Sequence, residues 1–110
     1  DDSIIGFIIG VPLEVFSEES WSHYDINLGK ENTIYTYVFL MKRFYRKKAG
    51  YSKTLKMIYL NWCKKKNYTY ITGHVKLGIS KNFSDSTNIV KIFSKWYNST
   101  SPFEYYRRIL

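Results

Sequence analysis

Midway along the chain the sequence reads Phe44-Tyr45-Arg46-Lys47-Lys48-Ala49-Gly50-Tyr51-Ser52-Lys53-Thr54-Leu55. The residues before this stretch, Thr33–Met41, are rich in Ile, Tyr, Thr, Val and Phe and predict a strand. The residues after it predict a helix with Ser52 as N-cap and a stop at Asn67. The apolar face of that helix consists of Leu55, Ile58, Tyr59, Trp62 and Cys63. The stretch is therefore a basic, glycine-containing turn between a strand and a helix.

A turn of this kind has the geometry of a phosphate site. The backbone N–H groups at a helix N-terminus converge on one point, and the helix dipole favours an anion there. Gly50 allows close approach of the backbone, and Arg46, Lys47 and Lys48 add positive charge. A solvated basic loop around a glycine turn fits the same residues and, on the turn alone, is the favoured interpretation.

The remaining segments predict the rest of a sheet. Ile4–Val11 is a continuous β-branched and aromatic run typical of a buried strand. Alternation predicts a third strand at Tyr68–Leu77, and Phe103–Leu110 indicates a closing strand. Residues 17–32 are polar and acidic, and they predict a loop with a short helical turn. Residues 98–102 predict a turn.

A second helix is expected before the closing strand. Ser86 or Thr87 is its predicted cap. Its apolar face consists of Ile89, Ile92, Phe93 and Trp96. The predicted order of strand, strand, helix, strand, helix, strand gives an α/β (α+β) fold with a mixed, mostly antiparallel sheet and one βαβ unit. The length of 110 residues fits a single domain, 1–110.

Composition and charge exclude several classes of protein. With 45% apolar and 19% aromatic residues, the chain is not a disordered tail. No apolar run reaches the roughly 18 residues of a spanning helix, so we expect no membrane association. The net charge of +8 is unevenly spread: residues 1–31 hold seven acids and one base, and residues 32–110 hold 16 bases and two acids. The positive charge of residues 32–110 favours an anionic partner.

Other cofactor motifs are absent from the sequence. There is no GxxxxGK[ST] and no GxGxxG, which argues against a nucleotidase P-loop and a dinucleotide fold. Two isolated histidines and one cysteine do not make a zinc site, so no metal is expected. Cys63 lies within an apolar helical pattern and is expected to be a buried thiol of a reducing, cytoplasmic compartment.

The strand, basic turn, helix and strand together resemble the central acetyl-CoA motif of GNAT-type (GCN5-related) N-acetyltransferases. In that family the loop pattern is [QR]-x-x-G-x-[GA], reached from a strand and opening a helix. The resemblance is carried by residues 35–75 and extends over roughly residues 4–110. It identifies Ile71–Val75 with the strand after the motif helix, Asn88–Tyr97 with the next helix and Phe103–Arg108 with the last strand.

The resemblance implies an enzyme that moves an acetyl group from acetyl-CoA to an amine, by direct attack of the amine on the thioester. Backbone groups of Phe39, Leu40 and Met41 would pair with the pantetheine arm. The diphosphate would lie over Lys47–Ser52, with Arg46 as a nearby cation. The implied donor-binding residues are Phe39, Leu40, Met41, Arg46, Lys47, Lys48, Ala49, Gly50, Tyr51 and Ser52.

The sequence departs from the family pattern at three positions. Ala49 replaces the first motif glycine, and Tyr51 stands where glycine or alanine is usual, so its ring is expected to point away from the diphosphate. The family often has a tyrosine as general acid in the second helix, and Phe93 falls at that place. Tyr97, or Tyr105 and Tyr106 on the last strand, are substitutes. The strand and helices that begin the family fold have no counterpart here, so we expect an N-terminally truncated domain.

The catalytic candidates are His74, Tyr97 and Glu104. His74 is a base candidate because imidazole titrates near physiological pH, although a hydrogen-bonded histidine on a half-buried strand is the favoured interpretation. Glu104 is one of two acids in the basic region and is either a base or an ion-pair partner for Arg107 or Arg108. The acidic first 31 residues suit a cationic amine as acceptor.

Two other functions remain open at this point. A basic chain with interspersed Tyr, Phe and Trp fits a small nucleic-acid-binding module, although Lys53, Lys56, Lys64 and Lys66 are expected on the solvated outside of the helix. A degenerate domain that binds CoA or a protein partner without catalysis is the other, and Ala49 and Phe93 favour it. The sequence names no acceptor and leaves the oligomeric state open, a homodimer included.

Overall fold

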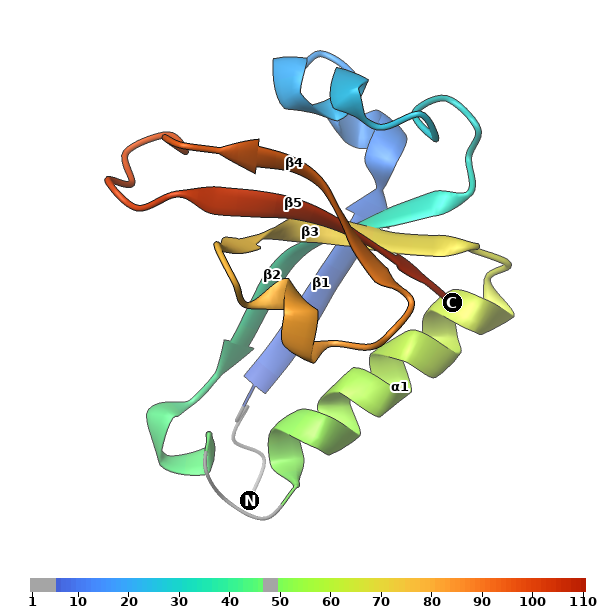
Figure 1. Cartoon of the computed structure of the whole chain (residues 1–110). Coiled ribbons are helices and arrows are strands. Elements are labelled where there is room, and N and C mark those ends of the chain that lie inside the picture. Colours follow the sequence, from blue (N-terminus) through green and yellow to red (C-terminus); the bar gives the residue numbers. More distant parts are fainter. Residues whose placement is uncertain (1–5, 47–49) are drawn as a thin grey trace.

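The computed structural model describes residues 6–46 and 50–110 (Figure 1). The strands are β1 (Gly6–Pro12), β2 (Thr33–Met41), β3 (Tyr70–Lys76), β4 (Thr87–Phe93) and β5 (Phe103–Ile109), and the α-helix is α1 (Tyr51–Lys65). Short 3-10 turns are η1 (Leu13–Phe16), η2 (Ser20–Tyr24), η3 (Arg43–Tyr45) and η4 (Ser80–Asn82). No helix in the described ranges is long and apolar enough to cross a membrane.

The strands form one mixed sheet in the order β1-β2-β3-β5-β4. β2 and β3 are parallel and are joined by α1, which confirms the predicted βαβ unit. The other three neighbouring pairs are antiparallel. The predicted fold class, an α/β (α+β) arrangement with a mostly antiparallel sheet, is therefore confirmed.

The predicted C-terminal end of α1 is confirmed, and the predicted N-cap is wrong. Asn67 has the left-handed φ of 66° that was expected after the helix. The N-cap is Gly50, with φ 76°, and not Ser52, which lies inside the first turn. A left-handed backbone strongly favours glycine, so Gly50 sets where the helix starts.

The predicted second helix is wrong: residues 87–93 form strand β4. This segment contains Thr87, Ile89, Val90 and Ile92, all β-branched, and it pairs with β5 in an antiparallel hairpin. A bulge at Val90 shifts the alternation by one residue, because Ile89 and Lys91 oppose the consecutive residues Tyr106 and Tyr105. Val90 and Phe93 consequently share one core, whereas Ile89 and Ile92 of the predicted apolar face are 49% and 52% exposed.

The two faces of the sheet carry separate cores. On one face, Cys63 of α1 packs with Ile34, Ile71 and Tyr106. On the other, η1 and η2 cover a core of Leu13, Trp21, Tyr35 and Tyr105. Figure 1 shows α1 below the sheet and the blue N-terminal turns above it.

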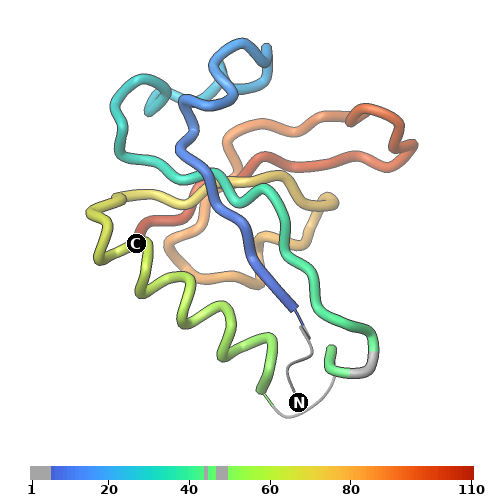
Figure 2. Tube along the Cα trace, turned by 180° about the vertical axis from the view of Figure 1, so that it is seen from behind, coloured from blue at the N-terminus to red at the C-terminus, as the bar shows by residue number. Residues whose placement is uncertain are grey.

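The sheet divides between β2 and β3. The two strands pair only where Thr33–Tyr35 faces Tyr70–Thr72. Immediately afterwards a bulge at Tyr37 interrupts the pairing of β2 with β1, since Gly10 faces Thr36 and Ile9 faces Val38. In Figures 1 and 2, β1 and β2 then run away from β3 toward the N-terminal end of α1. The divergence leaves a gap in the sheet at its centre.

A buried carboxylate fastens the N-terminal turns to the sheet. The side chain of Asp25 is fully buried and accepts hydrogen bonds from the Tyr105 hydroxyl at 2.7 Å, the Arg107 guanidinium at 2.7 Å and the Asn27 backbone N–H at 2.9 Å. Burial would raise the pKa of this carboxyl, but the bonds from Tyr105, Asn27 and Arg107 hold it below its ordinary value. Asp25 thus joins the 17–32 loop to β5.

We expect Asp25→Ala to lower the free energy of unfolding by about 3–5 kcal/mol, because it leaves a charged guanidinium and a phenol buried without their acceptor. Asp85→Ala, at an exposed position, is the matched control and should change stability by less than about 0.5 kcal/mol. Urea unfolding measures both. Equal, small effects of the two substitutions would contradict this account.

His74 lies inside an aromatic cluster on the face covered by η1 and η2. Its ring stacks on Trp96 at 3.7 Å between centroids and meets the edge of Trp21 at 4.8 Å. Its Nδ1 is 2.7 Å from the Tyr35 hydroxyl, and its Nε2 is buried without a hydrogen-bond partner. Burial lowers the pKa of His74 from 6.5 to about 3, so the imidazole is neutral in the folded protein at physiological pH.

This low pKa predicts sensitivity to mild acid. Between pH 6.5 and about 3 the unfolded chain binds a proton at His74 that the folded chain does not, so the free energy of unfolding falls as the pH falls. We expect His74→Asn, which keeps an acceptor for Tyr35, to reduce this slope between pH 7 and 5, by up to about 1.4 kcal/mol per pH unit.

Thermal or urea unfolding at several pH values measures the slope. Asp25 and Glu104 have lowered pKa values, so the stability that their ionised forms contribute is lost only below about pH 5. His23→Asn, on the exposed η2 turn, controls for the loss of a histidine. An unchanged slope in His74→Asn would show that His74 is protonated in the folded state.

Candidate functional site

A groove of about 520 Å³ lies where β2 and β3 part. It runs between α1 and the η4 segment and is lined by side chains from β1, β2, β3 and β5 of the divided sheet. The apolar side chains lining it include Ile8, Phe39, Leu60, Ile71, Val75 and Phe83. The polar ones include Thr36, Ser52, Lys56, Tyr59, Asn82 and Arg108. This size and mixture suit a small-molecule ligand with a few polar groups.

One end of the groove is the N-terminus of α1. Ser52, in the first turn, lines the groove. The helix hydrogen bonds begin with the Thr54 N–H, which donates to the Gly50 carbonyl at 2.8 Å. The N–H groups of Tyr51, Ser52 and Lys53 therefore have no acceptor within the helix and present the positive end of its dipole. This end of the groove is suited to an anion.

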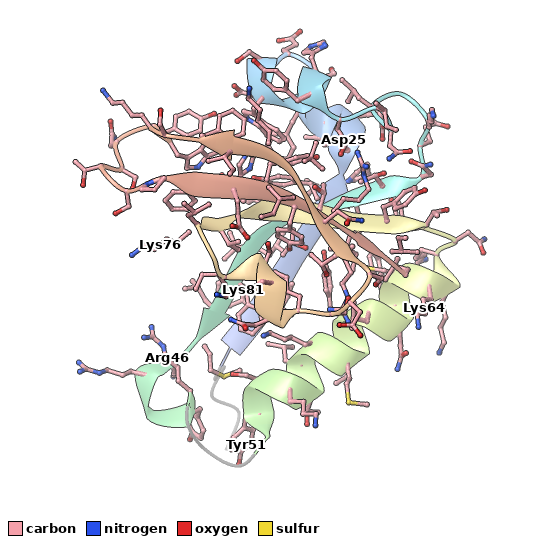
Figure 3. The ribbon with its side chains drawn as sticks, in the orientation of Figure 1. Asp25, Arg46, Tyr51, Lys64, Lys76 and Lys81 are labelled. Atoms are coloured by element: carbon pink, nitrogen blue, oxygen red, sulfur yellow. The ribbon has the colours of Figure 1, made fainter. Side chains whose placement is uncertain are left out.

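The structure describes the residues on both sides of the basic turn that leads to α1. Arg46 follows η3 and donates its Nε–H to the Met41 carbonyl at 3.1 Å, which ties the turn to the end of β2. The ring of Tyr51 meets Tyr45 edge-on, with centroids 5.3 Å apart. Figure 3 places Arg46 beside the end of β2 and Tyr51 at the start of α1. The predicted donor-binding residues Lys47, Lys48 and Ala49 lie outside the described residues.

The second half of β2 has one edge that does not pair within the described sheet. Phe39, Leu40 and Met41 pair with β1, whereas the pairing with β3 ends at Tyr35. The backbone groups that alternate residues of this segment direct toward β3 can therefore hydrogen-bond an extended ligand in the gap. The side chains differ: Phe39 lines the groove, Met41 is buried, and Leu40 is 51% exposed.

The three catalytic candidates come from separate places. His74 contributes to the groove lining, although its ring is enclosed by the aromatic cluster. Tyr97 lies in the turn between β4 and β5, is 62% exposed and donates to Glu19 at 3.3 Å. Glu104 is fully buried on β5 and neither it nor Tyr97 lines the groove. The structure does not bring the three together.

Glu104 holds the segment between β3 and η4. Its carboxylate accepts the Gly78 N–H at 2.7 Å, the Ser80 N–H at 2.9 Å and the Ser80 hydroxyl. Burial would raise the pKa of this carboxyl, but the bonds from Ser80 and Gly78 and the charge of Lys81 keep it below its ordinary value. Both of the ion-pair partners predicted for Glu104 were wrong: Arg107 binds Asp25, and Arg108 lines the groove.

The residues expected to replace the missing tyrosine lie in different environments. Because residues 87–93 are a strand, Phe93 does not occupy a helical position and packs in the core with Trp96. Tyr105 is buried and bound to Asp25, whereas Tyr106 lines the groove. Burial raises the pKa of Tyr106 to about 12, so its phenol keeps its proton.

Gly73 keeps the Tyr106 phenol close to the gap. A Cβ on Gly73 would lie 3.0 Å from the Tyr106 hydroxyl and 3.3 Å from the Thr36 carbonyl. Thr36 and Gly73 belong to the two parting strands, so the phenol lies beside the gap between β2 and β3.

Several groove residues were missed from sequence. Tyr59, whose hydroxyl is 2.9 Å from that of Thr36, was assigned only to the apolar face of the helix. Asn82 and Arg108 had no assigned role in ligand binding. Lys56 is exposed, as expected, but it also lines the groove, since it follows Ser52 by four residues and shares its face of α1. That spacing was the available signal. No group of three or more metal-binding side chains occurs in residues 6–46 and 50–110.

No protein-family model matches the chain, and no curated protein matches it. Solved structures do. Ard1 from Thermoplasma volcanium matches with a TM-score of 0.70 and 18% identity, over 98% of this chain and 64% of that one. A protein assigned to the GNAT acetyltransferase family from Desulfovibrio desulfuricans matches with a TM-score of 0.69 and 11% identity, over 99% and 63%.

Arabidopsis thaliana NAA60, solved in complex with acetyl-CoA, matches with a TM-score of 0.65 and 17% identity, over 99% of this chain and 67% of that one. The chain thus spans less than two thirds of the length of the first two structures. Together with the strand order and the parted β2 and β3, these likenesses show that the chain has a GNAT-type acetyltransferase fold.

Proposed function

We propose that this chain binds acetyl-CoA and serves in transfer of the acetyl group to an amine. The observation that carries the proposal is the continuous groove from the N-terminus of α1 to the gap between β2 and β3. It offers an anion site, an apolar passage and an unpaired strand edge in the order in which CoA presents a diphosphate, a pantetheine arm and a thioester. The fold is shared with structures solved with acetyl-CoA or CoA bound.

In this proposal the chain mainly positions a donor that is already reactive. The amine attacks the thioester carbonyl, so a C–N bond forms, the C–S bond breaks, the amine loses a proton and the thiolate gains one. Backbone N–H groups on the free edge of β2 stabilise the developing oxyanion. The protonated phenol of Tyr106 lines the groove and supplies the proton to the thiolate, while the proton lost by the amine passes to water and the phenolate regains one from water.

In this proposal none of the three predicted catalytic residues acts as the base or the acid. His74 is the one that lines the groove, but its pKa of about 3 makes it a weak base. We assign it to orienting the Tyr35 hydroxyl. The hydrogen bonds of Glu104 and the exposed turn of Tyr97 favour structural roles for both.

The acceptor is an amine whose class stays open. Acidic residues of the first 31 were expected to attract a cation, but Asp25 binds Arg107, Glu14 accepts the Gly29 N–H, and Glu19 accepts the Tyr97 hydroxyl. These three acids serve the fold, which weakens the argument for a cationic acceptor.

The nucleic-acid alternative has less support. Figure 3 shows Arg46, Lys64, Lys76 and Lys81 in different parts of the molecule instead of along one stripe.

The buried thiol of Cys63, whose pKa burial raises to about 11, is compatible with the cytoplasmic compartment that we propose. A catalytically inactive CoA-binding domain is distinguished by the experiment below.

Acetyl-CoA should raise the melting temperature of the chain, since it binds only the folded state. Gly50→Glu should abolish the shift, because it places a carboxylate beside the first-turn N–H groups of α1. Gly50→Gln imposes the same strain at φ 76° without the charge and should retain part of the shift. No shift for the wild-type chain at millimolar acetyl-CoA would refute the proposal.

Release of CoA thiol in the presence of a panel of amines and N-terminal peptides then separates transfer from binding alone. A thermal shift without thiol release above the rate of spontaneous hydrolysis would identify a domain that binds the donor without catalysis.

A further inference from the structure

Lys56 is a cation at the mouth of the groove. It lies on the groove-facing side of α1 together with Ser52, Tyr59 and Leu60. Its ammonium stands 5.2 Å from the centre of the Phe39 ring, on β2, and 5.8 Å from that of Phe83, beyond η4. The side chain therefore reaches across the opening between the two walls.

The surroundings of Lys56 are short of negative charge. The groove lining holds a second cation, Arg108, and no carboxylate from the described residues. The salt bridge found in the described ranges joins Asp25 and Arg107 and does not involve Lys56. Residues 32–84 contain no Asp or Glu at all. The exposed ammonium thus contacts two aromatic faces and solvent, and aromatic faces interact with it more weakly than an anion would.

Lys56 also lies within reach of the anion site of α1. It follows Ser52 by one turn, a rise of about 6 Å along the axis, and helical side chains lean toward the N-terminus. The ammonium and the unpaired N–H groups of the first turn can consequently contact the same ligand atoms. Compared with those N–H groups, Lys56 adds a full and movable charge.

We propose that Lys56 binds the diphosphate of the donor, leaving the rings of Phe39 and Phe83 as it does so. The inference rests on the proposed function, because it assumes that a CoA thioester occupies the groove. It adds to the basic turn a recognition residue on the groove face of α1.

The test compares Lys56→Met with Lys64→Met by isothermal titration calorimetry. Both substitutions remove one lysine charge from α1 while keeping an apolar side chain, but Lys64 lies in the last turn, far along α1 from Tyr51 (Figure 3). For CoA we expect Lys56→Met to weaken binding by roughly 10- to 100-fold and Lys64→Met by less than about 2-fold. Lys56→Arg, which keeps the charge, should recover most of the affinity.

Two further ligands identify the group that is bound. Dephospho-CoA keeps the diphosphate but lacks the 3′-phosphate, and Lys56→Met should weaken its binding as much as that of CoA. Pantetheine has no phosphate, so competition between pantetheine and CoA should give the same pantetheine affinity for both proteins. Thermal melting without ligand establishes that each variant is folded.

The outcomes are distinguishable. Equal CoA affinities of Lys56→Met, Lys64→Met and the wild-type chain would overturn the role of Lys56 and leave the proposed function intact. A loss with CoA but not with dephospho-CoA would overturn the assignment to the diphosphate. A wild-type chain that does not bind CoA would overturn the proposed function and this inference with it.

Discussion

β2 and β3 are hydrogen-bonded neighbours only from Thr33 to Tyr35, and beyond that point the sheet divides. The division is compatible with a stable fold because each strand has a second partner: β1 pairs along β2, and β5 pairs along β3. α1 bridges the two halves because its Cys63 packs in one cluster with Ile34 of β2 and Ile71 of β3. The groove, the free edge of β2 and the position of the helix N-terminus all follow from this short parallel pairing.

Local sequence patterns predicted the elements that decide the fold class. The limits of β2 and the left-handed Asn67 agree with the sequence, because β-branched runs and helix stops are encoded within a few residues. β4 was missed for a reason that lies elsewhere in the chain. The bulge at Val90 depends on how β4 meets Tyr105 and Tyr106, and a periodicity within residues 87–96 does not contain that information.

The candidate site could be predicted where it is made of backbone and not where it is made of side chains. The turn around Gly50 was recognisable, since a left-handed glycine before a helix leaves a local signature. The environments of His74 and Glu104 were not, because Trp96, Tyr35 and Ser80 reach them only through the tertiary fold. The role of a charged residue such as Lys56 depends on whether a second wall of a groove lies opposite it, and that wall is formed only by the tertiary fold.

The division of the aromatic residues between the two faces has a spectroscopic consequence. Of the three tryptophans, Trp21 and Trp96 lie in the cluster beneath the N-terminal turns, whereas Trp62 is on α1 and is 44% exposed. Near-ultraviolet circular dichroism is therefore dominated by the rings around His74, which are held rigidly against one another. Fluorescence also includes the emission of Trp62 on the helix face, so the two optical signals weight the two halves of the core differently.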